Sequence, residues 1–167
     1  MKEISIDLPL KIANRALLQT GDKVLLSGIL YTARDAAHKR MVEYLQSGKD
    51  IPFELKNAAI FYAGPTPARP GTICGVIGPT TSVRMDKYTP AILKAGAKVL
   101  IGKGERSSEV IDAIQQNQAV YLVAVGGAAA LLSKCVLSSE AIAWQDLGTE
   151  AIHKLVVKDF PCYVSVL

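Results

Sequence analysis

Polar and apolar residues alternate at two different periods along the 167-residue chain, and this pattern predicts strands and helices that follow one another. Strict alternation over 3–8 predicts a strand, and the run over 23–31, which follows Gly21-Asp22, predicts a second. The period then lengthens to about 3.6 residues, which predicts a helix from about Asp35 to Gln46 that ends before Gly48. The first third of the chain is therefore expected to contain two strands and a helix.

Short apolar runs continue this alternation to the end of the chain. They predict further strands over 58–63, 72–77, 98–101, 120–125, 155–157 and 162–166. A helix is expected after the hydroxyl residues at 80–82, although Pro90 also fits a later start near Thr89, after a separate turn. Another helix is expected to end at Gln116. The sequence thus predicts an α/β mixed fold in which helices lie between short strands.

Composition narrows the class of protein. No repeat or linker divides the chain, so 1–167 is expected to form a single domain. The longest nearly apolar run, 119–132, is shorter than the roughly 20 residues that a membrane helix needs, and the N-terminus does not resemble a signal peptide. A cytoplasmic protein that does not bind membranes is the expectation.

The net charge of +4 is carried by scattered Lys and Arg residues rather than by basic clusters interleaved with aromatic residues. This pattern argues against nucleic-acid binding and favours small anionic substrates or an acidic partner. The three cysteines, Cys74, Cys135 and Cys162, are too dispersed for a disulfide framework or a C-x-x-C metal site. They are interpreted as packing residues.

The segment from Gly78 to Asp86 is the strongest candidate for chemistry. Thr80, Thr81 and Ser82 follow a Gly-Pro break and precede Arg84, so that backbone N–H groups, hydroxyls and a guanidinium can converge on an anion. A simple helix cap with Arg84 in solvent is the alternative.

Two further cationic positions also follow predicted strands. Arg34 can hold a carboxylate through two hydrogen bonds, and His38 can exchange protons or be oriented by Asp35, unless this is only an exposed helix start with a solvent-facing histidine. Lys103 lies between two glycines, in either a ligand-binding or a plain turn. Open α/β sheets gather ligand groups at such positions, so Arg34, Arg84 and Lys103 together suggest a dicarboxylate.

Four segments in order, GDKVLLSGILYTARDAAHKR, IFYAGPTPARPG, GPTTSVRMDKYTP and LIGKG, resemble the beta subunit or C-terminal domain of the class I iron-sulfur fumarases and the related L-tartrate dehydratases. The resemblance covers about residues 21–166, and TARDAAHKR is more similar to the fumarase version. It implies a swivelling β/β/α domain with a compact mixed sheet flanked by helices. It also implies a hydro-lyase that adds water reversibly to fumarate to give L-malate.

The resemblance further implies a role for each candidate residue. Arg34 and Arg84 correspond to substrate-carboxylate clamps, Thr81 to a substrate contact, and Lys103 to an additional charge partner. Both Thr80 and His38, the latter with Asp35, remain candidates for proton transfer. A histidine has the more suitable pKa, whereas Thr80 is expected to lie closer to the substrate.

The four-iron four-sulfur cluster of such enzymes is implied to lie in a separate alpha subunit, so this chain would bind no cofactor or metal. A complex of two alpha and two beta subunits is expected, active only when both are present. A tartrate or other hydroxy-dicarboxylate dehydratase is the enzymatic alternative, and an anion-binding or structural domain is the non-enzymatic one.

Overall fold

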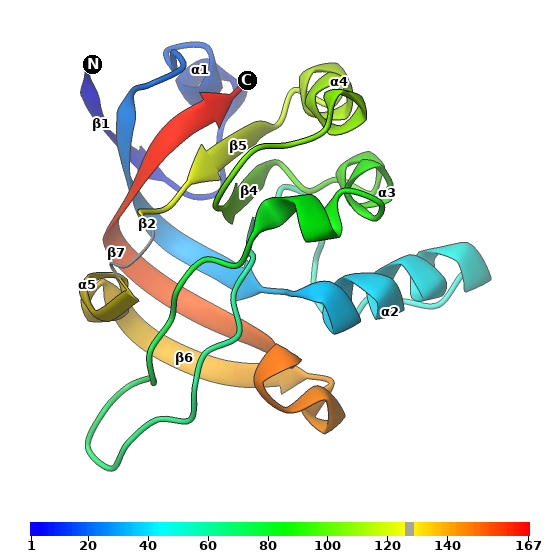
Figure 1. Cartoon of the computed structure of the whole chain (residues 1–167), viewed down its shortest axis with the longest axis vertical. Coiled ribbons are helices and arrows are strands. Elements are labelled where there is room, and N and C mark those ends of the chain that lie inside the picture. The colour runs from blue at the N-terminus through cyan, green and yellow to red at the C-terminus, as the bar shows by residue number, and fades with distance from the viewer. Residues whose placement is uncertain (126–128) are drawn as a thin grey trace.

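The computed structural model of the protein describes residues 1–125 and 129–167. The strands are β1 (Glu3–Asp7), β2 (Lys23–Thr32), β3 (Ala59–Phe61), β4 (Val99–Gly102), β5 (Val120–Val123), β6 (Val136–Ala143) and β7 (Ile152–Val166). The helices are α1 (Ile12–Arg15), α2 (Asp35–Ser47), α3 (Thr89–Lys94), α4 (Ser108–Gln116) and α5 (Ala129–Lys134), with 3₁₀ turns η1 (Ser82–Met85) and η2 (Gln145–Glu150). The fold is mixed α/β, as the sequence predicts, with a compact sheet flanked by helices (Figure 1).

The sheet has the strand order β1-β2-β3-β4-β5-β7-β6, in which the first five strands are mutually parallel. The long strand β7 is antiparallel to β2, β5 and β6. Because β7 pairs with both β2 and β5, strands β2, β3, β4, β5 and β7 form a closed ring. Because β2 to β5 run in the same direction, their carboxyl ends all lie at one edge of the sheet. The loops that lead to the helices begin at this edge.

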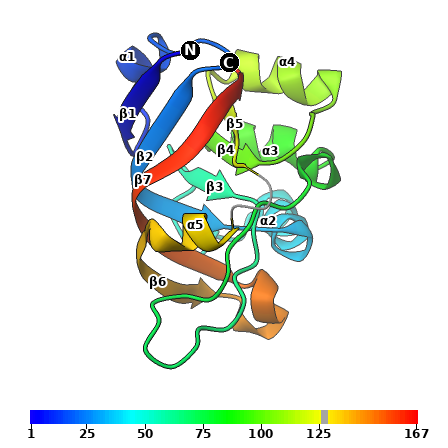
Figure 2. The same cartoon turned by 60° about the vertical axis from the view of Figure 1, so that its left-hand side comes forward.

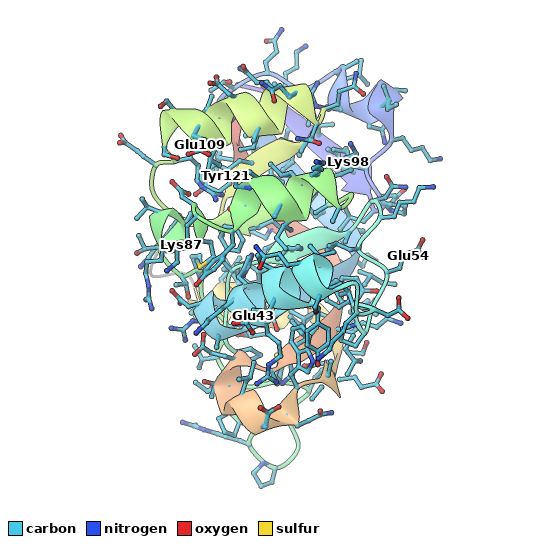
Figure 3. All side chains as sticks on the ribbon, turned by 90° about the vertical axis from the view of Figure 1, so that its right-hand side faces the viewer. Glu43, Glu54, Lys87, Lys98, Glu109 and Tyr121 are labelled. Carbon is cyan, nitrogen blue, oxygen red and sulfur yellow. The ribbon has the colours of Figure 1, made fainter. Side chains whose placement is uncertain are left out.

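Alternation along the strands divides the core between two faces of the sheet. Ala59 and Phe61 of β3 belong to a hydrophobic cluster with residues of β2, β5 and β7, whereas Ile60 and Tyr62 belong to a second cluster with α2, α3 and α4. Figure 3 shows these three helices one above another on the same side of the molecule. The second cluster therefore lies between the sheet and a layer of helices.

Most predicted elements are confirmed, with shifted ends. Strands form near 3–8, 23–31, 58–63, 98–101 and 120–125, and α2 begins at Asp35 as expected. The later start at Thr89 is correct for α3, and η1 is the separate turn before it. The fixed φ of Pro90 explains this start, because proline fits the first turn of a helix but not its interior.

The strands differ from the expectations in three respects. Residues 72–77 form no strand, since this segment folds back on its own loop, with the Val76 N–H donating to the Thr66 hydroxyl at 2.8 Å. The predicted strands at 155–157 and 162–166 are one continuous strand, β7, in which the positive φ of Asp159 (51°) accommodates an irregularity before Pro161. Strand β6 was not expected at all, because its residues are mostly exposed and lack clean alternation. Residues 126–128 lie outside the described ranges, and helix α5, which starts at Ala129, was not predicted.

Candidate functional site

Backbone hydrogen bonds hold the segment Thr80 to Ser82 across the carboxyl ends of β3 and β4. Figure 2 shows where these two strands lie in the sheet. The Thr80 N–H donates to the Tyr62 carbonyl oxygen at 2.6 Å, directly after β3. Thr81 forms a parallel bridge with Lys103, and the Ser82 N–H donates to the Lys103 carbonyl oxygen at 2.9 Å. The structure thus brings the predicted residues Thr80, Thr81 and Lys103 together, although they come from distant parts of the chain.

A glycine at the end of β4 allows this close approach. A Cβ atom on Gly102 would lie 2.0 Å from the Ser82 Oγ and 2.7 Å from the Tyr62 Cδ2. Only glycine leaves room for the serine side chain here. One of the two glycines beside Lys103 therefore serves to seat the hydroxyl segment on the sheet.

Arg34 and Asp35 place opposite charges at the start of α2. The Arg34 side chain lies across Gly64, where a Cβ would be 3.2 Å from an Arg34 terminal nitrogen, and its buried Nε has no hydrogen-bond partner among the described residues. Asp35 Oδ1 accepts from Arg84 Nε at 3.1 Å, and Asp35 Oδ2 lies 2.9 Å from another nitrogen of that guanidinium. The second contact is an ion pair without hydrogen-bond geometry. Arg84 is therefore bound to Asp35 rather than free in solvent.

Another carboxylate can replace Asp35 as the partner of Arg84. The side chain of Arg84 is 52% exposed and that of Asp35 is 32% exposed. Exposed ion pairs contribute about 0–1 kcal/mol, so another carboxylate can compete for Arg84 at little cost in stability.

His38 lies inside the protein beneath this edge and is 0% exposed. Its Nδ1 lies 2.8 Å from the Arg34 carbonyl oxygen, a contact in which Nδ1–H must be the donor, and its Nε2 has no hydrogen-bond partner among the described residues. The pKa of His38 is lowered to about 4, mainly by burial and in part by the Arg106 guanidinium. The expectation of a solvent-facing histidine is wrong, and Nδ1 is oriented by a carbonyl oxygen rather than by Asp35.

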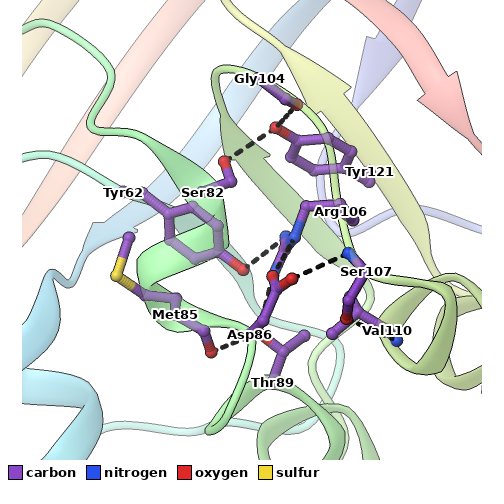
Figure 4. A network of polar contacts seen from close by, with 10 residues as sticks. All are labelled: Tyr62, Ser82, Met85, Asp86, Thr89, Gly104, Arg106, Ser107, Val110 and Tyr121. Carbon is purple, nitrogen blue, oxygen red and sulfur yellow. Dashed lines mark hydrogen bonds and ion pairs between the residues drawn. The ribbon is translucent and has the colours of Figure 1, made fainter.

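The sequence interpretation missed a buried arginine next to the site. Figure 4 shows Arg106 surrounded by Tyr62, Asp86, Thr89 and Tyr121. Arg106 Nε donates to Asp86 Oδ1 at 2.8 Å, and its two terminal nitrogens donate to the Thr89 hydroxyl at 2.8 Å and the Tyr62 hydroxyl at 3.1 Å. The only signal in the sequence is that Arg106 follows the Gly-Lys-Gly turn.

The described residues contain no group of three His, Cys, Asp or Glu side chains that could bind a metal ion. Cys162 is buried, whereas Cys74 and Cys135 are partly exposed, and burial raises the pKa of each thiol. These thiols do not form the set of neighbouring thiolates that an iron-sulfur cluster requires. In the part of the chain that the structure describes, no helix has the length and apolar character to span a membrane.

The whole chain, residues 1–167, matches the family model described as "Fumarase C-terminus". This chain belongs to the fumarase C-terminal family. It is 34% identical to the anaerobic class I fumarate hydratase of Escherichia coli and 36% identical to fumarate hydratase 2 of Leishmania major, over 98% of its own length in both cases. It is also 38% identical over 86% of its length to a protein named as the putative L(+)-tartrate dehydratase subunit beta of Methanocaldococcus jannaschii.

The chain covers a different share of the length of each relative. The alignments span 31% and 30% of the two fumarate hydratases but 76% of the tartrate dehydratase subunit. The chain therefore corresponds to one region of the longer enzymes. The names of the relatives are those of hydratases and dehydratases, which makes this a family of hydro-lyases.

Proposed function

We propose that this chain is the beta subunit of a class I fumarate hydratase and supplies the dicarboxylate-binding part of a shared active site. The observation that carries the proposal is that Arg34, Lys103 and the backbone of Thr80 and Thr81 lie where β2, β3 and β4 end, and that an ion pair with Asp35 brings Arg84 to the same edge. Membership of the fumarase C-terminal family supports fumarate and L-malate as the substrate pair.

In this proposal the two carboxylates of the substrate bind to the arginines. Arg34 offers a buried Nε–H that has no hydrogen-bond partner among the described residues, and Arg84 offers a guanidinium that can leave Asp35. Thr81 and Lys103 face the same edge from adjacent, bridged positions. Fixed cations of this kind stabilise the negative charge that develops on a carboxylate when a proton leaves the neighbouring carbon.

Thr80 and His38 both remain candidates for the proton-transfer step. The partial exposure of Thr80 beside the cations supports direct contact with substrate, whereas His38 lies in the interior and stays neutral near pH 7 because burial lowers its pKa to about 4. We therefore rank Thr80 first as the substrate-contacting group. A positioning role for His38 follows from its hydrogen bond to the Arg34 carbonyl oxygen.

The iron-sulfur cluster is assigned to an alpha subunit in this proposal, with two alpha and two beta subunits in a cytoplasmic enzyme. The dispersed cysteines and the lack of a metal-binding group among the described residues support this assignment. The exposed apolar side chains of Val83 and Val125, at the same edge as Arg84, fit a surface that another polypeptide covers.

An L-tartrate dehydratase is the second candidate. It is favoured by the higher identity, 38%, to a relative that is itself named as a beta subunit and is covered over 76% of its length. Malate and tartrate differ by one hydroxyl group, so a comparison of the turnover of malate, fumarate and tartrate separates the two candidates.

The test is anaerobic co-expression of this chain with a candidate alpha subunit, followed by assays with the three substrates. Thr80→Val is expected to lower fumarate hydration by about 10²–10⁴-fold, the usual effect of losing a proton-transfer group. Thr72→Val is the matched control, because Thr72 lies on the exposed loop and its hydroxyl contacts only the Arg69 carbonyl oxygen among the described residues.

The outcomes separate the hypotheses. Loss of activity in His38→Gln but not in Thr80→Val would reverse our ranking of the two residues. An isolated chain that hydrates fumarate without any iron-sulfur partner would contradict the shared site. A complex that binds dicarboxylates but turns none of them over would favour the anion-binding domain.

A further inference from the structure

The buried guanidinium of Arg106 contacts several residues that hold the candidate site together. The side chain of Arg106 is 0% exposed, and its ion-pair partner Asp86 is 13% exposed. The guanidinium also lies over the rings of Tyr62 and Tyr121, 5.2 and 4.8 Å from their centroids. Buried charges of this kind need their partners, because an unpaired charge in the interior is strongly destabilising.

Each of these partners is attached to part of the candidate site. Asp86 immediately follows η1, the turn that carries Arg84, and it also accepts from the Ser107 N–H at 2.8 Å. The Tyr62 carbonyl oxygen accepts the hydrogen bond from Thr80. The Thr89 hydroxyl donates to the carbonyl oxygen of Met85, the last residue of the same turn, at 2.9 Å.

Tyr121 connects the two loops that carry Thr81 and Lys103. Its hydroxyl lies 2.8 Å from the Ser82 Oγ and 2.8 Å from the Gly104 carbonyl oxygen. Since Ser82 follows Thr81 and Gly104 follows Lys103, this hydroxyl holds the two loops side by side (Figure 4).

We propose that Arg106 is a positioning residue for the hydro-lyase reaction: through Asp86, Thr89, Tyr62 and Tyr121 it fixes Thr80, Arg84 and Lys103 relative to one another. The expected effect on catalysis rests on the proposed function, whereas the expected effect on the arrangement of the loops does not. Arg106 itself lies behind these residues and does not contact the substrate.

A lysine cannot replace this arginine. The guanidinium directs Nε and both terminal nitrogens at three different oxygens at fixed angles, while its flat face packs against two rings. A lysine keeps the charge but is a single point donor without that planar fork. Arg106→Lys therefore loosens the loops while the buried charge balance with Asp86 is retained.

The first experiment measures amide hydrogen exchange in the isolated chain. Arg106→Lys is expected to speed exchange of the Thr80 and Ser82 amides at least 10-fold relative to the Lys98 amide, which donates to the Ala58 carbonyl oxygen inside the sheet. Tyr62→Phe keeps the ring but removes the hydroxyl that accepts from Arg106, so it is expected to speed exchange of the Thr80 amide. This second variant decides the matter if Arg106→Lys does not fold.

Arg40→Lys is the matched control for the exchange experiment. Arg40 also forms a two-fold hydrogen bond to a carboxylate, Asp146, and lies over a ring, that of Trp144, but on the surface. Arg40→Lys is expected to leave the exchange rates of the Thr80 and Ser82 amides unchanged. Faster exchange at all amides alike, or no change at Thr80 and Ser82, would overturn the proposal.

The second experiment measures turnover in the complex with the alpha subunit, per folded enzyme. Arg106→Lys is expected to lower kcat about 10–100-fold, since displacement of reacting groups by about 1 Å has an effect of this size. A residue that supports only stability would leave kcat per folded molecule unchanged, and that result would overturn the catalytic consequence. If the wild-type complex shows no hydro-lyase activity, the proposed function fails, and the exchange data alone decide whether Arg106 fixes the loops.

Discussion

The burial of His38 leads to a prediction about stability and pH. The imidazole is fully buried, its Nδ1–H donates to the Arg34 carbonyl oxygen, and its pKa is lowered to about 4, mainly by burial. Asp35 opposes this decrease and Arg106 reinforces it. Protonation of His38 therefore favours the unfolded chain, where a histidine has an ordinary pKa of about 6.5.

The size of the effect follows from the two pKa values. The unfolded chain binds a proton at His38 below about pH 6.5, whereas the folded protein does so only below about pH 4. The free energy of unfolding thus has its full value above pH 6.5 and decreases as the pH falls from 6.5 to 4. This linkage costs about 2 kcal/mol at pH 5 and roughly 3 kcal/mol below pH 4.

Urea denaturation of the wild type and His38→Gln at pH 7 and pH 5 tests this prediction, with the fluorescence of Trp144, the only tryptophan, as the signal. The variant should be less stable at pH 7, and its deficit should shrink by about 2 kcal/mol at pH 5. Hydrogen bonds from the Lys2 amide and the Arg40 guanidinium lower the pKa values of Asp22 and Asp146, which affects both proteins alike. A deficit that is the same at both pH values, or an NMR titration of His38 near pH 6.5, would refute the reasoning.

Three further substitutions test contacts on or near the same edge. Gly102→Ala should destabilise the fold by about 1–3 kcal/mol, because the new Cβ overlaps the Ser82 Oγ, and Ser82→Ala in the same chain should recover part of this loss in a thermal melt. Ser107→Ala should cost about 1 kcal/mol by removing the cap of α4, whereas Ser108→Ala, one position along, should cost less in the same assay. Asp35→Asn should strengthen binding of a dicarboxylate in calorimetry, since it frees a cation, and weaker binding would contradict this.

Helix α2 has a clear local signal in the sequence and was predicted correctly. Helix α2 has one apolar face, with Ala37 and Met41 buried, and it ends at Gly48, whose positive φ of 70° is typical of a helix C-terminus. Strand β6 has no comparable signal, because it is stabilised by pairing with β7 rather than by its own side chains. Pairings of this kind depend on residues far away in the sequence and cannot be inferred from periodicity.

The same distinction applies to the site. Arg34 and Lys103 could be selected because each follows a predicted strand, and parallel strands bring their carboxyl ends together. Thr80 was selected after the predicted strand at 72–77, which does not form, and it reaches the site through its hydrogen bond to the Tyr62 carbonyl oxygen. The burial of His38 depends on distant residues such as Tyr62 and Tyr88, whose ring centroids lie 5.3 and 6.2 Å from that of the imidazole in the folded chain. The role of Arg106 depends on two tyrosines that lie 44 and 15 positions away, and no short motif connects them.

Among the described residues, three buried side-chain polar atoms have no hydrogen-bond partner: Arg34 Nε, Asp35 Oδ2 and His38 Nε2, all from one five-residue segment. Only Arg34 Nε carries a proton to donate, because Asp35 Oδ2 is a carboxylate oxygen already ion-paired with Arg84, and the neutral His38 has its proton on Nδ1. A buried donor without a partner costs about 1–3 kcal/mol, and proteins tolerate such costs mainly at functional sites. A carboxylate bound to Arg34 would recover this free energy on binding and compete with Asp35 for Arg84. The start of α2 therefore has one unsatisfied buried donor, the Arg34 Nε–H, that an anionic ligand can use, whichever hydroxy-dicarboxylate is the substrate.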